Sequence, residues 1–475
     1  MTLISDLTER LGPSHVLTGA DMDRYARDWT GAYPGQPVAV VRPADTAEVS
    51  ACMALAARHG VAVVPVSGNT GLVGGTFTQG GLLLSLERMN RIRDLNPVTR
   101  SATVEAGVIL SKLHEAAAER GLYFPLWFGA RGSAMIGGVL STNAGGSNVL
   151  RYGSTRSLCL GLEVVLADGR VLNLMSALHK DNSGYGLRDL FIGAEGTLGI
   201  ITAAVMKLVP APRAYATATL GLRNLGDALV LLNRLQEASG GLVEAFEFMP
   251  ASYSRRLAHV RPDLGLPFDD IPEVTILTEL GATSPALCDA RDDGSVPLTD
   301  LLETTVAGLM EDGLIHDALV AQNEAQRRAM WARREAAAEI TFAKRPFVDT
   351  DIAVPLDCAV DFLTKIHARL QAVEQADEAL TVAHLGDGNL HFTVFPVDGS
   401  KATYDRVITM IEDVVAELRG SFSAEHGVGL SKLASMARRK DGVALDVMRA
   451  IKAALDPEGR MNPGKVIPAR GSDAS

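Results

Sequence analysis

Short apolar runs and one amphipathic stretch alternate along the N-terminal part of the chain. Pro37–Val41 and Val61–Pro65 have the apolar character of buried strands, and Thr46–His59 between them has apolar positions at helical spacing. Asp45 precedes this stretch and is a residue type that caps helix N-termini. The pattern predicts a β-α-β unit that follows a helical lead-in over residues 1–35.

More strands are predicted before the chain reaches two closely spaced prolines. Leu160–Leu166 and Val171–Leu174 flank an Asp-Gly turn and predict a hairpin, and Ile200–Leu208 is a long apolar run typical of a buried strand. The two prolines then end this strand, because proline lacks a backbone N–H. We therefore expect a first domain over residues 1–209.

Residues 210–420 alternate between strands and helices in the manner of an α+β domain. The expected strands are Thr217–Leu222, Leu242–Phe248, Val274–Leu280 and Phe347–Val354, and the expected helices are Leu225–Ala238, Leu301–Met310, Ala321–Phe342 and Ala359–Ala372. Residues 283–299 are polar and rich in turn formers, which indicates a solvated insertion. A last helical region, Lys432–Leu455, lies in a C-terminal segment over residues 421–475 that we expect to complete the active site and return to the first domain.

Composition excludes several classes of protein. The 475 residues carry a formal net charge of −11 and contain no Lys/Arg-rich block, which argues against nucleic acid as a partner. No apolar run reaches the roughly 18 residues of a membrane helix, and the N-terminus lacks the basic and apolar regions of a signal peptide. The 4 cysteines are far apart, as in a reduced cytosolic protein. We expect a soluble, cytoplasmic protein.

Two tracts of small residues lie in the first domain, at residues 65–75 and 129–148. Their glycines allow backbone N–H groups to approach an anion closely, because no Cβ intervenes and positive φ costs nothing. Neither tract has the Rossmann spacing or a Walker lysine. The first tract alone fits a structural turn as well as a phosphate cradle, but two tracts in one domain favour one long ligand.

Two histidines flank an Asp-Gly turn in the second domain. Asp387-Gly388 is a strong signal for a two-residue type I′ hairpin turn, so counting outward places His384 directly opposite His391. Cross-strand Cβ atoms lie about 4.5–5.5 Å apart, a separation at which two imidazoles can hold one metal ion. Further on, Glu425 could add a carboxylate ligand and His426 an unligated imidazole. Two histidines and one carboxylate with open positions form the pattern of a catalytic metal; the alternative is a set of polar turn residues without a metal.

The glycine tracts, together with Ile192-Gly193-Ala194-Glu195-Gly196, resemble the flavin-binding domain of the vanillyl-alcohol-oxidase/PCMH family. The resemblance implies a PCMH-type FAD-binding domain of two α/β subdomains, in which both tracts hold the FAD pyrophosphate and its neighbours. The residues that it assigns to FAD are Pro65, Ser67, Gly68, Asn69, Thr70, Gly71, Leu72, Gly74, Gly132, Ser133, Gly137, Gly138, Thr142, Asn143, Gly145, Gly146, Glu195, Gly196, Ile200 and Asn462. Ser67 stands where that family often has glycine. Residues 65–75 contain no His or Cys that could tether the ring, so we expect non-covalent FAD.

The second half resembles the FAD-linked oxidase C-terminal domain of D-lactate, glycolate and D-2-hydroxyglutarate dehydrogenases. The motifs that carry this resemblance are H-x-G-D-G-N-x-H at 384–391, Glu425-His426-Gly427-Val428-Gly429 and Asn462-Pro463-Gly464-Lys465-Val466. Lys180–Tyr185 and Trp331-x-x-Arg334-Glu335 look most like the D-2-hydroxyglutarate branch. The resemblance implies an α+β substrate or cap domain with an antiparallel sheet.

Roles for the polar residues follow from this resemblance. It implies that His384, His391 and Glu425 bind a divalent metal, zinc or another such as Mn²⁺. It also implies that His426 is the catalytic base and that Arg334 binds the substrate carboxylate. Asn389 fits either a substrate-orienting residue or a plain turn asparagine.

This sequence departs from the D-2-hydroxyglutarate branch at two positions expected to set substrate specificity. Aligned without a gap, Asp349 stands where that branch has a lysine for the distal carboxylate of the substrate, and Ala338 stands where it has a threonine. A substrate carboxylate would then meet a carboxylate, which disfavours D-2-hydroxyglutarate. The alternative is that Lys344 or Arg345 replaces the missing lysine.

The sequence therefore predicts an FAD- and metal-dependent dehydrogenase that oxidises a D-2-hydroxy acid to the 2-keto acid by hydride transfer to flavin N5. One alternative is a transferase of the alkyl-dihydroxyacetone-phosphate synthase type, whose His-rich motif differs. Another is a flavin-free metal-binding or structural protein. The electron acceptor stays open among an electron-transfer flavoprotein, a quinone, a cytochrome and oxygen, and the oligomeric state is open, with a homodimer as one form.

Overall fold

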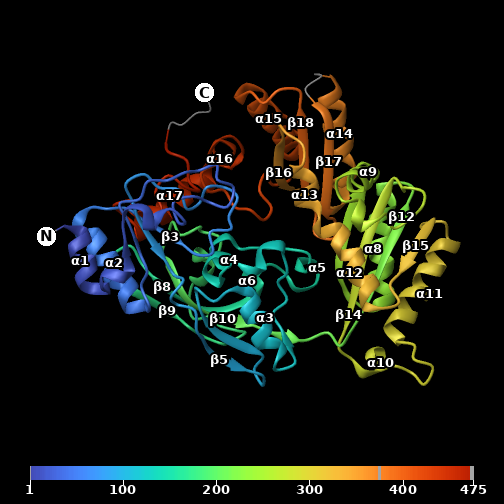
Figure 1. Ribbon diagram of the computed structural model, residues 1–475, viewed down its shortest axis with the longest axis horizontal. Coiled ribbons are helices and arrows are strands. Elements are labelled where there is room, and N and C mark those ends of the chain that lie inside the picture. The colour runs from blue at the N-terminus through green and yellow to red at the C-terminus, as the bar shows by residue number, and fades with distance from the viewer. Residues whose placement is uncertain (1, 373–375, 471–475) are drawn as a thin grey trace. The chain divides into compact units, whose positions relative to one another are not determined.

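The computed structural model describes residues 2–372 and 376–470, which form two compact units (Figure 1). The first unit contains Met1–Gly145, Gly153–Pro210 and Glu425–Ser475, and the second contains Gly146–Tyr152 and Ala211–Ala424. Both combine helices with sheets, which confirms the α+β class. Among the described residues, no helix is both long enough and apolar enough to cross a bilayer.

Two main sheets build the first unit. The first contains, in spatial order, β1 (Val16–Leu17), β2 (Ala39–Val41), β4 (Leu82–Ser85) and β3 (Val63–Val66). The second contains β5 (Ile92–Asn96), β6 (Ser101–Glu105), β10 (Ile200–Lys207), β8 (Cys159–Val165) and β9 (Val171–Leu174), and a short pair contains β11 (Val209–Pro210) and β7 (Leu122–Tyr123). The helices are α1 (Leu3–Leu11), α2 (Thr46–His59), α3 (Leu110–Ala118), α4 (Ile136–Thr142), α6 (Thr155–Leu158), α7 (Arg188–Phe191), α16 (Leu433–Arg439) and α17 (Gly442–Leu455).

The predicted β-α-β unit is confirmed. β2 and β3 both run parallel to β4, which lies between them, and α2 connects them. Asp45 caps α2 by accepting the N–H of Glu48 at 2.8 Å. The hairpin of β8 and β9 is confirmed too, with antiparallel pairing from Leu162 to Val165.

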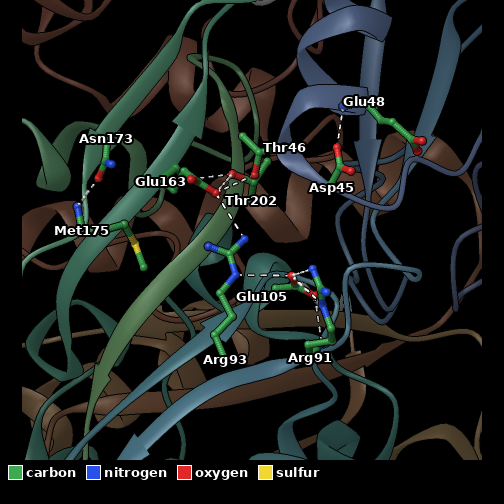
Figure 2. A network of polar contacts seen from close by, with 10 residues as sticks. All are labelled: Asp45, Thr46, Glu48, Arg91, Arg93, Glu105, Glu163, Asn173, Met175 and Thr202. Carbon is green, nitrogen blue, oxygen red and sulfur yellow. Dashed lines mark hydrogen bonds and ion pairs between the residues drawn. The ribbon is translucent and has the colours of Figure 1, made fainter. Parts of the chain in front are cut away.

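A buried carboxylate network supports the second sheet of this unit (Figure 2). Glu105, at the end of β6, accepts hydrogen bonds from Nη2 of Arg91 at 2.8 Å and from the backbone N–H of Arg91 at 2.9 Å. Arg93 lies between Glu105 and Glu163, with its Nε 3.3 Å from the first and its Nη2 3.5 Å from the second. Thr46, at the start of α2, donates to Glu163 at 2.6 Å. The network therefore ties β5, β6 and β8 to the helix of the first sheet.

The second unit is one seven-stranded antiparallel sheet with helices on both faces. The strands, in spatial order, are β15 (Asp317–Val320), β12 (Ala214–Leu222), β14 (Val274–Ala282), β13 (Val243–Pro250), β17 (Ala376–His384), β18 (Asn389–Pro396) and β16 (Val348–Ala353). The helices are α5 (Val149–Tyr152), α8 (Ala228–Ser239), α9 (Ala251–Val260), α10 (Pro285–Cys288), α11 (Pro297–Glu311), α12 (Glu324–Glu335), α13 (Ala337–Phe342), α14 (Ala359–Ala372) and α15 (Lys401–Glu417). One core lies under α8, α11, α14 and α15, and a smaller one under α9, α12 and α13.

Three predicted helices are shorter or interrupted. The helical lead-in ends with α1, because Gly12 has a φ of 86° and Pro13 follows it. The helix expected over 321–342 is divided into α12 and α13 at Ala336. The helix expected over 432–455 is divided into α16 and α17, and Asp441 starts the second piece by accepting the N–H of Ala444 at 2.8 Å. The expected insertion at 283–299 contains α10 and the first residues of α11.

The Glu105 network generates a stability prediction. Burial alone would raise the pKa of Glu105, but Arg91 and Arg93 more than offset it and hold that pKa below its usual range. A carboxylate with a lowered folded-state pKa stabilises the fold above its unfolded-state pKa, and this contribution is lost as the pH falls through the folded-state pKa. Glu105→Gln should therefore lower the free energy of unfolding at neutral pH by about 1.5–3 kcal/mol and flatten the loss of stability in acid.

The measurement is chemical denaturation from pH 7 to pH 3. The control is Glu115→Gln, which removes an exposed carboxylate paired with Lys112 three residues away and should leave the midpoint unchanged. Equal stability of the Glu105 variant and the wild type at pH 7 would contradict the role given to this network.

Candidate functional site

The two small-residue tracts line one cavity of about 360 Å³ in the first unit. Of the residues expected to bind FAD, those that line it are Pro65, Ser67, Gly68, Asn69, Thr70, Gly71, Leu72, Gly137, Gly138, Thr142, Gly145, Glu195, Gly196 and Ile200. Glu425 and His426 line the same cavity. The first unit therefore places the expected base and one expected metal ligand beside the glycine tracts.

Close approach of the two tracts explains part of their composition. A Cβ on Gly68 would lie 2.2 Å from the carbonyl oxygen of Ser133, so only glycine fits there. Ser67 accepts the N–H of Gly138 through its Oγ at 3.2 Å. The departure from glycine at Ser67 therefore adds a bond between the tracts and does not obstruct them.

Six residues assigned to FAD do not line the cavity: Gly74, Gly132, Ser133, Asn143, Gly146 and Asn462. Gly146 belongs to the second unit. Gly74 has a φ of 69°, and a Cβ there would lie 2.9 Å from the Tyr33 ring. Asn143 ends α4 in the left-handed region and accepts the N–H of Arg156 at 2.9 Å. These contacts shape the loops around the cavity.

The loop that carries Glu425 and His426 is held by Glu195. Both carboxylate oxygens of Glu195 accept backbone N–H groups, from Val428 at 2.7 Å and Gly429 at 2.8 Å. Burial raises the pKa of Glu195, and these two N–H donors partly offset that effect. Asn462 donates from Nδ2 to the carbonyl oxygen of Glu195 at 2.8 Å. Glu195 and Asn462 therefore support this loop, and the cofactor contact expected for each stays a prediction.

The histidine hairpin of the second unit differs from its prediction. Leu385–Gly388 form a four-residue loop, in which Gly388 has a φ of 82°, so the two-residue type I′ turn is wrong. His384 pairs with Asn389 and His391 with Val382, which makes the two histidines diagonal neighbours on one face of the sheet. Their ring centroids lie 5.5 Å apart.

The physical reason for this loop is its packing against the end of β16. A Cβ on Gly388 would lie 2.3 Å from the carbonyl oxygen of Val354, and the N–H of Val354 donates to the carbonyl of Gly388 at 3.1 Å. Asp387 accepts the N–H of Asn389 at 3.1 Å and donates its own N–H to the carbonyl of His384 at 3.2 Å. Tertiary packing therefore overrides the local turn signal.

Each histidine has a buried carboxylate nearby. Glu247, on β13, contacts Nδ1 of His384 through Oε1 at 2.8 Å. Its Oε2 lies 2.8 Å from Nη2 of Arg334, as an ion pair without hydrogen-bond alignment. Burial acts to raise the pKa of Glu247, but the positive charges of His384 and Arg334 outweigh it and lower that pKa. Arg334 is 7% exposed, and among the described residues its Nε and Nη2 have no hydrogen-bond partner.

Asp351, on β16, is the carboxylate near His391. Its Oδ1 accepts Nδ2 of Asn389 at 3.0 Å and lies 4.0 Å from Nδ1 of His391. Its Oδ2 accepts the backbone N–H of Ala424 at 3.2 Å. Ala424 is the last residue of the second unit and immediately precedes the expected ligand Glu425. Asp351 therefore holds the backbone next to that ligand. Neither Glu247 nor Asp351 was predicted, although Glu247 stands between Phe246 and Phe248 in the apolar part of β13.

The two specificity positions differ in their surroundings. Asp349 pairs with Thr393, and its Oδ1 accepts the Thr393 hydroxyl at 2.6 Å. Asp349 lies two residues before Asp351 on β16, and Asp351 is the strand partner of His391. Alternate residues of a strand point to the same face, so Asp349 and His391 share one face of the sheet. Ala338 is exposed on α13. Lys344, one expected substitute for the missing lysine, has its Nζ 3.3 Å from Glu378.

Comparison with known proteins adds two family matches. Residues 37–175 match the FAD binding domain family, and residues 211–466 match the C-terminal domain of FAD linked oxidases. Together these matches cover both units. They agree with the cavity built by the glycine tracts and with the histidine motif of the second unit.

Relatives and solved structures give the same picture. The chain is 37% identical over 455 residues to a D-2-hydroxyglutarate dehydrogenase of Xanthomonas citri pv. viticola, covering 94% of this chain and 93% of that one. It is 36% identical to the mitochondrial D-2-hydroxyglutarate dehydrogenase of Bos taurus, covering 97% and 82%. The fold resembles p-cresol methylhydroxylase with TM-score 0.71 and 16% identity over 98% and 96% of the two chains. It also resembles alkyldihydroxyacetonephosphate synthase, with TM-score 0.69 and 16% identity over 97% and 84%. These two likenesses concern the fold alone.

The contact between the two tracts generates a prediction about flavin. Gly68→Ala should push the tracts apart, since its Cβ would lie 2.2 Å from the Ser133 carbonyl, and the purified protein should contain much less FAD. The measurement is the flavin absorbance released by acid precipitation, relative to protein. The control is Gly308→Ala within α11, where a Cβ meets nothing within 4 Å and flavin content should not change. A Gly68 variant with a full complement of FAD would refute the proposed cradle.

Proposed function

We propose that this chain, which belongs to the FAD-linked oxidase family that includes the D-2-hydroxyglutarate dehydrogenases, oxidises a D-2-hydroxy acid to the 2-keto acid. The observation that carries this proposal is the buried group of Arg334, Glu247 and His384. It combines a guanidinium, whose Nε and Nη2 have no hydrogen-bond partner in the part of the chain that the structure describes, with an imidazole suited to a metal. Such a group suits a small anionic substrate whose hydroxyl is activated beside its carboxylate.

The residues fit both absent groups. The glycine cradle supports FAD, which we propose is bound without a covalent link, because residues 65–75 contain no His or Cys. His384, His391 and Glu425 offer two nitrogens and one carboxylate oxygen, the donor set of a catalytic zinc site with open positions. When bound, the flavin accepts a hydride at N5 and the metal ion stabilises negative charge on the substrate oxygen.

Protein residues supply the remaining steps in this proposal. Arg334 binds the substrate carboxylate through its Nε and Nη2, which form the fork that matches two carboxylate oxygens. His426 takes the proton of the substrate hydroxyl while the hydride leaves the adjacent carbon. Asn389, whose Oδ1 is buried without a hydrogen-bond partner among the described residues, orients the hydroxy acid. The electron acceptor, a homodimer and a cytoplasmic location stay predictions.

Two histidine variants separate the proposed roles. Removing the metal with a chelator, or His384→Ala, should abolish turnover and leave FAD bound, because two remaining ligands hold zinc too weakly. His426→Ala should lower kcat by roughly 10²–10⁴-fold and keep the metal, as expected for a general base. Metal content, flavin absorbance and kcat are measured on each variant. Full activity without metal would exclude the metal role, and loss of metal from the His426 variant would make His426 a ligand.

Asp349 makes the substrate class a separate proposal. We infer that D-2-hydroxyglutarate is a poor substrate and that 2-hydroxy acids with neutral, apolar or cationic side chains are better, even though the named relatives are D-2-hydroxyglutarate dehydrogenases. A second carboxylate near Asp349 would cost several kcal/mol, roughly 10³-fold in affinity. Lys344 is already paired with Glu378, which disfavours it as a replacement for the lysine.

The test is kcat/KM for D-lactate, longer D-2-hydroxy acids, D-malate and D-2-hydroxyglutarate. Asp349→Lys should raise kcat/KM for D-2-hydroxyglutarate by about 10²-fold or more, because it replaces repulsion with attraction. Asp292→Lys, in the exposed segment before α11, changes the net charge equally and should leave the ratios unchanged. A wild type that prefers the dicarboxylates would overturn this assignment.

A further inference from the structure

We propose that Glu247 is a positioning residue that aligns His384 for zinc and Arg334 for the substrate carboxylate with one buried side chain. This inference rests on the proposed function. It concerns a residue that lies on β13, far in sequence from the histidine motif and from α12.

The strand register brings Glu247 to this place. Glu247 is the backbone partner of His384, so their side chains point to the same face of the sheet. The Glu247 side chain is 1% exposed, and its two oxygens contact different groups: Oε1 contacts Nδ1 of His384, and Oε2 lies beside Nη2 of Arg334, each at 2.8 Å. One carboxylate therefore joins an imidazole and a guanidinium from two separate elements.

The contact with His384 determines which ring nitrogen can bind a metal. A carboxylate only accepts hydrogen bonds, so Nδ1 carries the proton and Nε2 becomes the ligating atom. Carboxylates that accept from the second nitrogen of a ligating histidine fix its tautomer and ring orientation, and they raise its basicity. Glu247 should therefore strengthen zinc binding by His384.

The contact with Arg334 has a second consequence. Because Nη2 lies beside Glu247 without hydrogen-bond alignment, the Nε–Nη2 edge of the guanidinium keeps its donors for another partner. The ion pair holds the guanidinium plane in place while the substrate carboxylate is absent. Loss of Glu247 should thus raise KM for the hydroxy acid as well as weaken zinc binding.

The neighbouring strand provides an internal control. Glu279, on β14, is 4% exposed and accepts Nε of Arg327 at 2.7 Å and Nε1 of Trp331 at 2.8 Å. Arg327 and Arg334 are two turns apart on α12, so both carboxylates tie the same helix to the same sheet. Glu279 differs in that its backbone partners are Thr217 and Ala245, away from the histidine hairpin.

The experiment compares zinc affinity of metal-stripped, FAD-loaded wild type, Glu247→Gln and Glu279→Gln by competition with a chelating dye. Glu247→Gln should bind zinc about 10–100-fold more weakly, with flavin content unchanged and KM for the hydroxy acid raised. Glu279→Gln should bind zinc within about 2-fold of wild type, even though it loses a comparable helix tie. Glu247→Asp, which keeps the charge but shortens the side chain, provides a second variant if Glu247→Gln fails to fold, and it too should weaken zinc binding.

The outcomes distinguish this inference from the function on which it rests. A wild type that binds no zinc would contradict the metal role in the proposed function. A wild type that binds zinc, with Glu247 variants of equal affinity, would overturn only the role of Glu247. Equal weakening in the Glu247 and Glu279 variants would also overturn it, since the effect would then come from docking of α12.

Discussion

The contact on which the first unit most depends is the pair of hydrogen bonds that Glu195 accepts from Val428 and Gly429. The carboxylate is buried beside the glycine tracts, and the segment it holds comes from the far end of the chain. These bonds hold the segment that directly follows His426, which lines the same cavity as Glu195. Gly429 completes the fit, because its φ is 49° and a Cβ there would lie 2.3 Å from the carbonyl oxygen of Val73.

The second unit applies a related principle on one face of its sheet. Glu247, Glu279 and Asp351 are buried acids, and each is compensated by cations or by aligned donors from neighbouring elements. A buried carboxylate without such partners would be costly, so these contacts fix α12, the histidine hairpin and the end of β16 relative to one another. In the proposed function, Arg334 is thereby held in place for the substrate carboxylate.

Sequence reasoning succeeded where the signal is local. Asp45 and the apolar spacing after it gave α2 with its cap, and the Asp-Gly turn gave the hairpin of β8 and β9. It failed at the histidine hairpin, because Gly388 packs closely against the carbonyl of Val354. A rule based on the turn sequence alone does not include this tertiary contact. It also missed α15, although Val407, Ile411 and Val414 are buried at helical spacing and could have revealed it. The partners of Glu195 and Glu247 lie too far away in sequence for any periodicity to indicate them.

The central claim is that a D-2-hydroxy acid reduces the flavin of this protein with the help of a metal held by His384, His391 and Glu425. The most direct measurement is the absorbance of the bound flavin under anaerobic conditions during titration with single D-2-hydroxy acids, before and after metal removal. The account predicts that at least one D-2-hydroxy acid bleaches the oxidised flavin, that its L-enantiomer does not, and that bleaching disappears without metal and returns with zinc. A flavin that no D-2-hydroxy acid reduces, or that is reduced equally well without metal, would contradict the account.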